Sequence, residues 1–149
     1  MLKPIVTLVG RPNVGKSTLF NRIVSARLAI TDAIPGTTRD RVTAQTDWNG
    51  VCFDIVDTGG IEEEKRAAHE KPLAISSAEF VPMIREQTEV AISEADVIVF
   101  VVDVKAGVTA TDLEVAQLLR RRQRRVNDLR RPVVLLSVNK ADNQSRCEE

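Results

Sequence analysis

The sequence predicts an α/β fold: a doubly wound, mostly parallel sheet with one antiparallel hairpin. Short β-branched apolar runs alternate with segments of helical periodicity, and an Asn-Gly pair joins two runs of alternating polarity. Strands that alternate with helices are joined by crossovers, which make those strands parallel. A length of 149 residues, with 43% hydrophobic and 28% charged residues, suits one globular domain with its own core.

The first half of the chain predicts three strands and one helix. The apolar run Ile5–Val9 is a strand that ends at a glycine, and Gly15–Val24 is a helix because its apolar residues recur on one face. The runs Val42–Trp48 and Val51–Ile55 flank the Asn-Gly pair, whose residues tolerate the positive φ angles of a tight turn. These two runs therefore form an antiparallel hairpin, and its second strand runs out at Asp57.

The second half predicts two helices and two more strands. Residues 62–78 are charged and aperiodic, which indicates a long loop. Pro82–Ala95 has helical spacing, and Val97–Val102 is a continuous apolar run typical of a buried strand. A Thr-x-x-Glu capping box at Thr111 begins the second helix, and Pro132–Val138 is the last strand.

The composition excludes several classes of protein. Lysine plus arginine (21) balance aspartate plus glutamate (21), so no overall charge attracts the chain to nucleic acid or to a membrane. One histidine and two distant cysteines fit neither a histidine-based zinc site nor a disulfide framework. No apolar run has the length of a membrane span or of a secretory leader. We therefore expect a cytoplasmic protein with no membrane and no DNA as a partner.

The segment from Gly10 to Ser17 matches G-x-x-x-x-G-K-[ST], the phosphate-binding loop, between a predicted strand and a predicted helix. The glycines let backbone N–H groups approach phosphate oxygens, and the helix adds the positive end of its dipole. Lys16 places a cation on the outer phosphates, and Ser17 offers a hydroxyl to magnesium. A glycine-rich turn that caps a helix is the alternative. The predicted phosphate-binding residues are Gly10, Arg11, Pro12, Asn13, Val14, Gly15, Lys16, Ser17 and Thr18.

A second motif, D-x-x-G, begins at Asp57, where the second hairpin strand ends. Its carboxylate would hold magnesium through water, and the N–H of Gly60 would meet the terminal phosphate. Taken alone, the tetrapeptide also fits an ordinary turn. The predicted nucleotide-binding residues of this segment are Asp57, Thr58, Gly59, Gly60 and Ile61.

A third motif, N-K-x-D, consists of Asn139, Lys140, Ala141 and Asp142 and follows the last predicted strand. The carboxylate of Asp142 can accept from both the N1–H and the 2-amino group of guanine, whereas adenine would leave it unpaired. Lys140 can cover the base with its methylenes, and Asn139 can brace the phosphate-binding loop. All three motifs follow strands, at the edge where doubly wound sheets bind ligands. Together they predict a guanine-nucleotide-binding domain that takes GTP or GDP with magnesium.

On these motifs the chain resembles the translation-factor-related GTPases, and most closely the amino-terminal GTPase domain of the EngA (Der) family of bacterial ribosome-assembly factors. The segments that carry the resemblance are Val9–Ile23, Pro35–Arg41, Asp57–Ile61 and Asn139–Asp142. The resemblance implies a P-loop NTPase fold and GTP hydrolysis coupled to maturation of the large ribosomal subunit. The tRNA-modifying and Era-like relatives share these motifs and remain alternatives.

Catalysis is expected to depend on Lys16, Thr38 and Gly60. Thr38 is the predicted switch threonine, with Thr37 as the alternative one place earlier. The bound terminal phosphate would order this loop, and hydrolysis would release it. The predicted magnesium ligands are Ser17, Thr38 and Asp57.

Two positions bear on the rate of hydrolysis. Ras-like switches place a water-orienting glutamine directly after D-x-x-G, and this chain has Ile61 there, so slow intrinsic hydrolysis is one expectation. In related GTPases an asparagine at the position of Asn13 helps to ligate potassium beside the phosphates. Asn13 is therefore the predicted potassium ligand, shared with the loop 36–38, and a plain turn former is the alternative. A nucleotide-binding module without catalysis is the alternative for the chain as a whole.

The resemblance also implies a further strand and helix after N-K-x-D. Because the sequence stops at Glu149, we expect residues 1–149 to form a single GTPase domain that is incomplete at its carboxyl end, with Pro132–Val138 at an open sheet edge. The arginines between residues 120 and 131 could contact RNA phosphates or lie on a solvated helix end. The expected partner of the longer parent is the large ribosomal subunit or its RNA.

Overall fold

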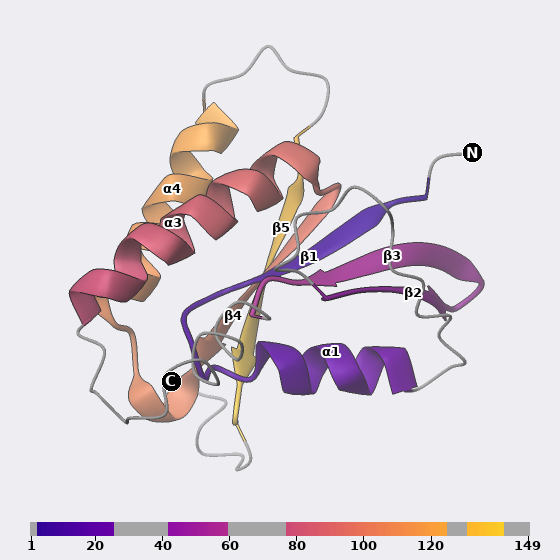
Figure 1. Cartoon of the computed structure of the whole chain (residues 1–149), viewed down its shortest axis with the longest axis horizontal. Helices are drawn as coiled ribbons and strands as arrows, with labels where there is room; N and C mark the ends of the chain where they lie inside the picture. The colour runs from indigo at the N-terminus through magenta and orange to yellow at the C-terminus, as the bar shows by residue number, and fades with distance from the viewer. Residues whose placement is uncertain (1–2, 26–41, 60–76, 125–130, 142–149) are drawn as a thin grey trace.

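The computed structural model describes residues 3–25, 42–59, 77–124 and 131–141 (Figure 1). Within these ranges, five strands form one sheet, and helices alternate with most of the strands along the chain. In chain order the elements are β1 (Ile5–Val9), α1 (Lys16–Ser25), β2 (Val42–Trp48), β3 (Val51–Asp57), α3 (Ser77–Glu94), β4 (Val97–Asp103), the 3-10 helix η1 (Val104–Ala106), α4 (Ala110–Arg124) and β5 (Val133–Asn139).

The sheet has the strand order β2-β3-β1-β4-β5. The central strand β1 is parallel to β3 and β4, β4 is parallel to β5, and β2 is antiparallel to β3. This arrangement confirms the predicted α/β fold with a doubly wound, mostly parallel sheet and one hairpin. Because four strands point the same way, their last residues, Val9, Asp57, Asp103 and Asn139, lie along one edge of the sheet.

Helices cover both faces of the sheet, with α1 on one face and α3 and α4 on the other (Figure 1). Leu8 of β1 packs with Phe20 of α1. The next residue, Val9, packs in a second cluster with Ile84 of α3 and Val115 of α4. Since successive side chains of a strand point to opposite faces, β1 separates two cores and is buried by both.

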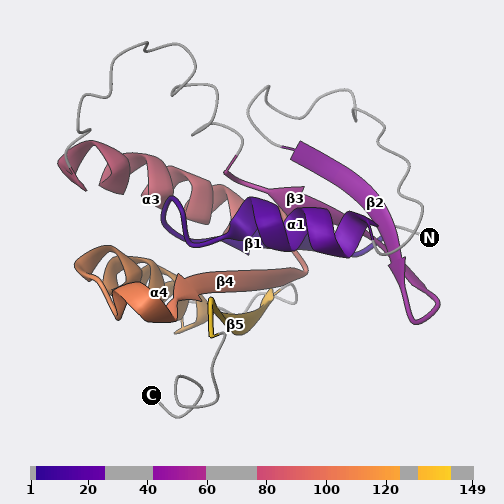
Figure 2. The same cartoon turned by 90° about the horizontal axis from the view of Figure 1, so that it is seen from below.

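The β2–β3 hairpin projects from one end of the molecule (Figure 2). Its turn residues Asn49 and Gly50 have φ angles of 52° and 81°, as the Asn-Gly pair predicts. Trp48 pairs with Val51 beside the turn and is 52% exposed. At the other end of the hairpin, Asp57 reaches the carboxyl edge of the sheet, so the hairpin spans the sheet from one edge to the opposite edge.

The start of α3 differs from the prediction. The helix begins at Ser77, more than one turn before Pro82, so its first two residues belong to a helix rather than to the predicted loop. The sequence pointed to Pro82 because the helical spacing of apolar residues is evident only from there on, after the charged, aperiodic stretch. In the structure Pro82 lies inside the helix, where it removes one backbone hydrogen bond without ending the helix.

The start of α4 also differs, because the capping box lies two residues earlier than predicted. The carboxylate of Asp112 accepts from the backbone N–H of Thr109 at 2.9 Å and from its Oγ1 at 2.8 Å. In return, Thr109 Oγ1 accepts from the N–H of Asp112 at 3.3 Å. Both Thr109 and Thr111 have an acidic residue three places on, and the earlier pair forms the cap because Asp112 is buried while Glu114 is exposed.

The strand β5 lies at the edge of the sheet formed by the described residues. Its large apolar side chains are about half exposed, at 57% for Val133, 52% for Leu135, 64% for Leu136 and 49% for Val138. Across the described ranges, no helix combines the length and the apolar character that crossing a membrane requires.

Candidate functional site

The loop between β1 and α1 packs closely against the ends of two other strands. A Cβ added to Gly10 would lie 2.4 Å from the carbonyl oxygen of Val101, and one added to Gly15 would lie 2.1 Å from Asn139 Nδ2. Gly15 also has a φ of 99°, in the left-handed region that favours glycine. The two fixed glycines of the phosphate-binding motif are therefore required by the packing of this loop.

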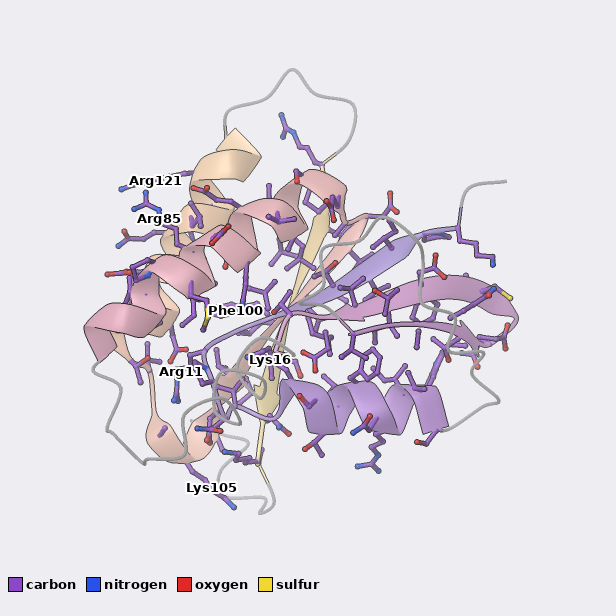
Figure 3. The ribbon with its side chains drawn as sticks, in the orientation of Figure 1. Arg11, Lys16, Arg85, Phe100, Lys105 and Arg121 are labelled. Carbon is purple, nitrogen blue, oxygen red and sulfur yellow. The ribbon has the colours of Figure 1, made fainter. Side chains whose placement is uncertain are left out.

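Lys16 begins α1 and reaches back across this loop (Figure 3). The residue is only 4% exposed, and its Nζ donates to the carbonyl oxygens of Gly10 at 2.7 Å and Arg11 at 2.8 Å. These two bonds hold the ammonium group at the amino-terminal end of α1, where the helix dipole is positive. A fixed cation at a helix amino terminus is an arrangement that binds phosphate.

Asp57 meets this loop where β3 ends. Ser17 Oγ donates to Asp57 Oδ2 at 2.8 Å, and the N–H of Gly59 donates to Asp57 Oδ1 at 2.9 Å. A Cβ added to Gly59 would lie 3.4 Å from Cε of Lys16, so the turn after β3 lies against the loop itself. Thr58 anchors this turn to the core, because its Oγ1 donates to the carbonyl oxygen of Leu8 at 2.8 Å.

The Ser17–Asp57 pair fits a magnesium ion. A hydroxyl and a carboxylate are hard oxygen donors, and Mg²⁺ binds through one or two such groups while it keeps water and substrate phosphate oxygens as its other ligands. Among the described residues, no group of three or more His, Cys, Asp or Glu residues could hold a metal ion. The donor set therefore suits a magnesium that arrives with a phosphate ligand rather than a metal held by the protein alone.

The end of β5 contacts the same loop. Asn139 Nδ2 donates to the carbonyl oxygen of Val14 at 2.8 Å, and Lys140 Nζ donates to that of Asn13 at 2.8 Å. Asn13 and Lys140 both have positive φ angles, of 64° and 62°. These contacts join segments that are 125 and 127 residues apart in the sequence. The first two residues of N-K-x-D thus lie beside the phosphate-binding motif, and Asn139 braces the loop as predicted.

Two carboxylates that sequence reasoning did not select also lie behind this loop. Asp103, the last residue of β4, accepts from Lys140 Nζ, and this bond is the main reason why the pKa of the Asp103 carboxyl lies below its usual value. Burial opposes the shift, and the N–H of Lys105 adds to it. The sequence signal that could have identified Asp103 is its position, because it directly follows the apolar run Val97–Val102 and ends β4 at the carboxyl edge.

The second of these carboxylates is Asp112. The Nε of Arg11 lies 3.3 Å from each of its oxygens, and Asp112 is only 4% exposed. The side chain of Arg11 ties the phosphate-binding loop to the start of α4, and the predicted role of Arg11 in nucleotide binding stays a prediction. No local pattern marked this pair, since its partners are 101 residues apart.

Several predicted site residues lie outside the described residues, and their roles stay predictions. The predicted residues that the structure does describe fall into two groups. The first group belongs to the phosphate-binding loop, to the start of α1 and to the turn after β3, which adjoin one another. The second group, at the end of β5, consists of Asn139, Lys140 and Ala141. Within the first group, the side chain of Thr18 is exposed. The predicted residues outside the described ranges are Thr37, Thr38, Gly60, Ile61 and Asp142.

Comparison with known proteins agrees with this geometry. A family described as 50S ribosome-binding GTPase matches residues 5–140. GTPase Der of Symbiobacterium thermophilum is 51% identical over 152 residues, which cover 99% of this chain and 28% of the relative. GTPase Der of Latilactobacillus sakei is 45% identical over 149 residues, which cover 100% of this chain and 30% of the relative. The chain thus spans less than a third of the length of these relatives.

Solved structures share the fold at low sequence identity. Translation elongation factor SelB from Methanococcus maripaludis, solved with the GTP analogue GppNHp, has a TM-score of 0.61 at 16% identity and matches 99% of this chain and 25% of its own. The G domain of the T. maritima FeoB iron transporter has a TM-score of 0.51 at 19% identity and matches 92% of this chain and 72% of its own. The resemblance to the EngA (Der) family and the P-loop GTPase fold that the motifs indicated are confirmed. With its motif segments gathered on one loop and a family match across nearly its whole length, the chain belongs to the 50S ribosome-binding GTPase family.

Proposed function

We propose that this domain binds GTP and GDP together with Mg²⁺ and hydrolyses GTP to GDP and phosphate, as a molecular switch. The observation that carries the proposal is the convergence of separate segments on one loop. Lys16 spans the loop, Asp57 accepts from Ser17, and Asn139 donates to Val14. Membership of a GTPase family supports the same activity.

The phosphate side of the site suits phosphoryl transfer. This reaction needs positioned substrate and neutralised charge more than it needs covalent chemistry. Backbone N–H groups of the loop and the ammonium of Lys16 would receive the phosphate oxygens, beside the positive end of the α1 dipole. Lys16 is already buried and ordered by two carbonyl groups, so little side-chain freedom remains to be lost when nucleotide binds.

Magnesium would be held by Ser17 Oγ and, through water, by the carboxylate of Asp57, with Thr38 as the third predicted ligand. When bound, the ion neutralises charge that develops on the outer phosphates. The 2.8 Å bond between Ser17 and Asp57 supports this assignment, because it brings both oxygen donors to one point beside Lys16.

The base side would select guanine through the carboxylate of Asp142. Asn139 and Lys140 hold the start of that motif against the phosphate-binding loop, at Val14 and Asn13. Guanine offers two donors to one carboxylate, whereas adenine would leave a buried charge unpaired, a mismatch that costs affinity strongly. We therefore expect GTP and GDP to bind far more tightly than ATP.

Two positions of the site bear on the rate of hydrolysis. We infer that intrinsic turnover is slow, because Ile61 cannot orient water, and that potassium bound at Asn13 raises it, with Thr38 and Gly60 completing the site. Single-turnover hydrolysis measured in potassium and in sodium tests this point. Equal rates of hydrolysis in the two salts would contradict the proposed potassium site. Nucleotide binding with no hydrolysis in either salt would show that the chain is a nucleotide-binding module without catalysis.

The biological role follows from the relatives rather than from the site. We propose that the longer protein to which this domain corresponds acts on the large ribosomal subunit, since the matching family is described as 50S ribosome-binding. In that protein, this domain would act as a cytoplasmic GTP-dependent switch. Co-sedimentation of the full-length protein with 50S subunits, in GTP and in GDP, tests the role.

Competition binding tests the nucleotide proposal directly. Fluorescent GDP bound to the chain should be displaced by GTP and GDP but not by ATP. Lys16→Ala should abolish binding, whereas Lys3→Ala serves as a matched control, because Lys3 is exposed and lies before β1 at the opposite edge of the sheet. Equal displacement by ATP and GTP would contradict the assignment of guanine.

A further inference from the structure

Asp103 joins two parts of the site through separate oxygens. Its Oδ2 accepts from Lys140 Nζ, and its Oδ1 accepts from the N–H of Lys105 at 2.9 Å, which caps η1. Lys140 Nζ in turn donates to the carbonyl oxygen of Asn13 in the phosphate-binding loop. Asp103 is 7% exposed, so this carboxylate is buried behind the loop, where its charge is paired with that of Lys140.

We propose that Asp103 is a positioning residue for guanine-nucleotide binding, which holds the ammonium of Lys140 on the carbonyl oxygen of Asn13 and thereby fixes the N-K-x-D loop against the phosphate-binding loop. The inference rests on the proposed function, because Lys140 and Asp142 act there on the base. It assigns Asp103 no contact with the nucleotide itself.

The geometry explains why Lys140 needs such a partner. Lysine carries its charge on a flexible four-carbon stem, and the side chain of Lys140 is 35% exposed. The backbone of Lys140 is also left-handed, at a φ of 62°, which a lysine adopts only when its surroundings hold it there. A carboxylate fixed at the end of β4 holds the stem in place before the base arrives, so the ordering cost does not fall on nucleotide binding.

Because the two carboxylate oxygens of Asp103 have different partners, one substitution can disrupt the contact with Lys140 and keep the contact with Lys105. Asp103→Asn retains an acceptor for the N–H of Lys105, so the cap of η1 is preserved. It presents an amide to Lys140, or at best a neutral acceptor, so the charge-assisted bond is lost. Asp96→Asn is the matched control, because Asp96 also accepts from a backbone N–H, that of Ile5 at 2.8 Å, and lies before β4 at the opposite edge of the sheet.

The experiment measures release of fluorescent GDP from the full chain, together with KM and kcat for GTP. Asp103→Asn should release GDP about tenfold faster and raise KM to a similar extent, with kcat unchanged, because the lost bond is on the base side. Asp96→Asn should match the wild type in all three. Unchanged GDP release from Asp103→Asn would overturn the proposal, even if its melting temperature falls, since a lower melting temperature alone indicates a structural role.

A double-mutant cycle separates positioning from general destabilisation. Lys140→Met removes the ammonium on which Asp103 acts, so Asp103→Asn added to Lys140→Met should change GDP release no further. Fully additive effects of the two substitutions would contradict the proposal. A wild-type chain that binds no guanine nucleotide would instead refute the proposed function, and the inference with it, whereas normal wild-type binding with an unaffected Asp103→Asn variant refutes the inference alone.

Discussion

Gly15→Ala tests how tightly the phosphate-binding loop and the end of β5 are packed together. The added Cβ would lie 2.1 Å from Asn139 Nδ2, on a backbone whose φ is 99°. Holding an alanine in that region costs about 1–3 kcal/mol. Displacing the Asn139 amide also breaks its 2.8 Å bond to Val14, worth about 1 kcal/mol.

The Gly15→Ala variant can avoid both the backbone strain and the clash if its loop leaves the conformation that binds nucleotide. The two energy costs are therefore expected to appear as a loss of nucleotide affinity. A sum of roughly 2–4 kcal/mol corresponds to a fall in GDP affinity of about 30- to 1000-fold. Fluorescence anisotropy of labelled GDP, titrated with wild-type and variant chains, measures this change.

Gly50→Ala provides the matched control. Gly50 also has a positive φ, of 81°, but apart from its two chain neighbours no atom of the described residues lies within 4 Å of a Cβ placed there. The residue is in the hairpin turn at the opposite edge of the sheet. We expect this variant to lose about 1 kcal/mol of stability in urea denaturation and to bind GDP like the wild type. A Gly15→Ala chain that binds GDP as tightly as Gly50→Ala would refute the reasoning.

Three further predictions concern single contacts of the site. Ser17→Ala removes the hydroxyl that donates to Asp57 and should raise the Mg²⁺ concentration needed for GTP binding by about tenfold, measured by magnesium titration with Ser25→Ala, at the exposed end of α1, as the control. Asp112→Asn leaves the largely buried Arg11 without its counter-charge and should lower the free energy of unfolding, measured in urea, by about 2 kcal/mol. The control is Glu114→Gln, at an exposed position of the same helix, which should leave the free energy of unfolding unchanged. Equal stability of the two variants would contradict this prediction. The pKa of Asp103 is lowered in the fold, so its stabilising contribution is present above the unfolded value of 3.8 and is lost as pH falls through the lower folded value. The difference in unfolding free energy between wild type and Asp103→Asn should therefore stay constant from neutral pH down to about 4 and shrink below it, and a difference that grows on acidification would exclude this assignment.

The sequence predicted the elements well where local patterns determine them. The strand runs and the Asn-Gly turn appear at nearly their predicted bounds, because side-chain alternation and positive φ are local properties. The helix starts were less accurate, for a different reason in each case. The start of α3 lies in a stretch whose sequence has no helical periodicity, and at the start of α4 two threonines have the same spacing to an acidic residue.

The predictable part of the site consists of motifs whose spacing is fixed by the chemistry of a phosphate or a base. Lys16, Ser17, Asp57 and Asn139 lie together as their motifs indicated. The contacts that were missed, Asp103 with Lys140 and Arg11 with Asp112, join distant segments through charged residues that usually face water. The position of Asp103 after an apolar run places it at the carboxyl edge of the sheet, but no local pattern identifies its partner or that of Asp112. Only the assembled sheet shows which charged residue each carboxylate contacts.

The exposed indole of the hairpin gives this protein a built-in optical probe. Trp48 is the chain's one tryptophan, and its pairing with Val51 puts it at the edge of the sheet opposite the motif loops. Its emission should therefore change little when a purine nucleotide is added. The emission should shift when β2 separates from β3, so tryptophan fluorescence can monitor local unfolding of the hairpin. In the same sample, a labelled nucleotide can report how much of the protein has nucleotide bound.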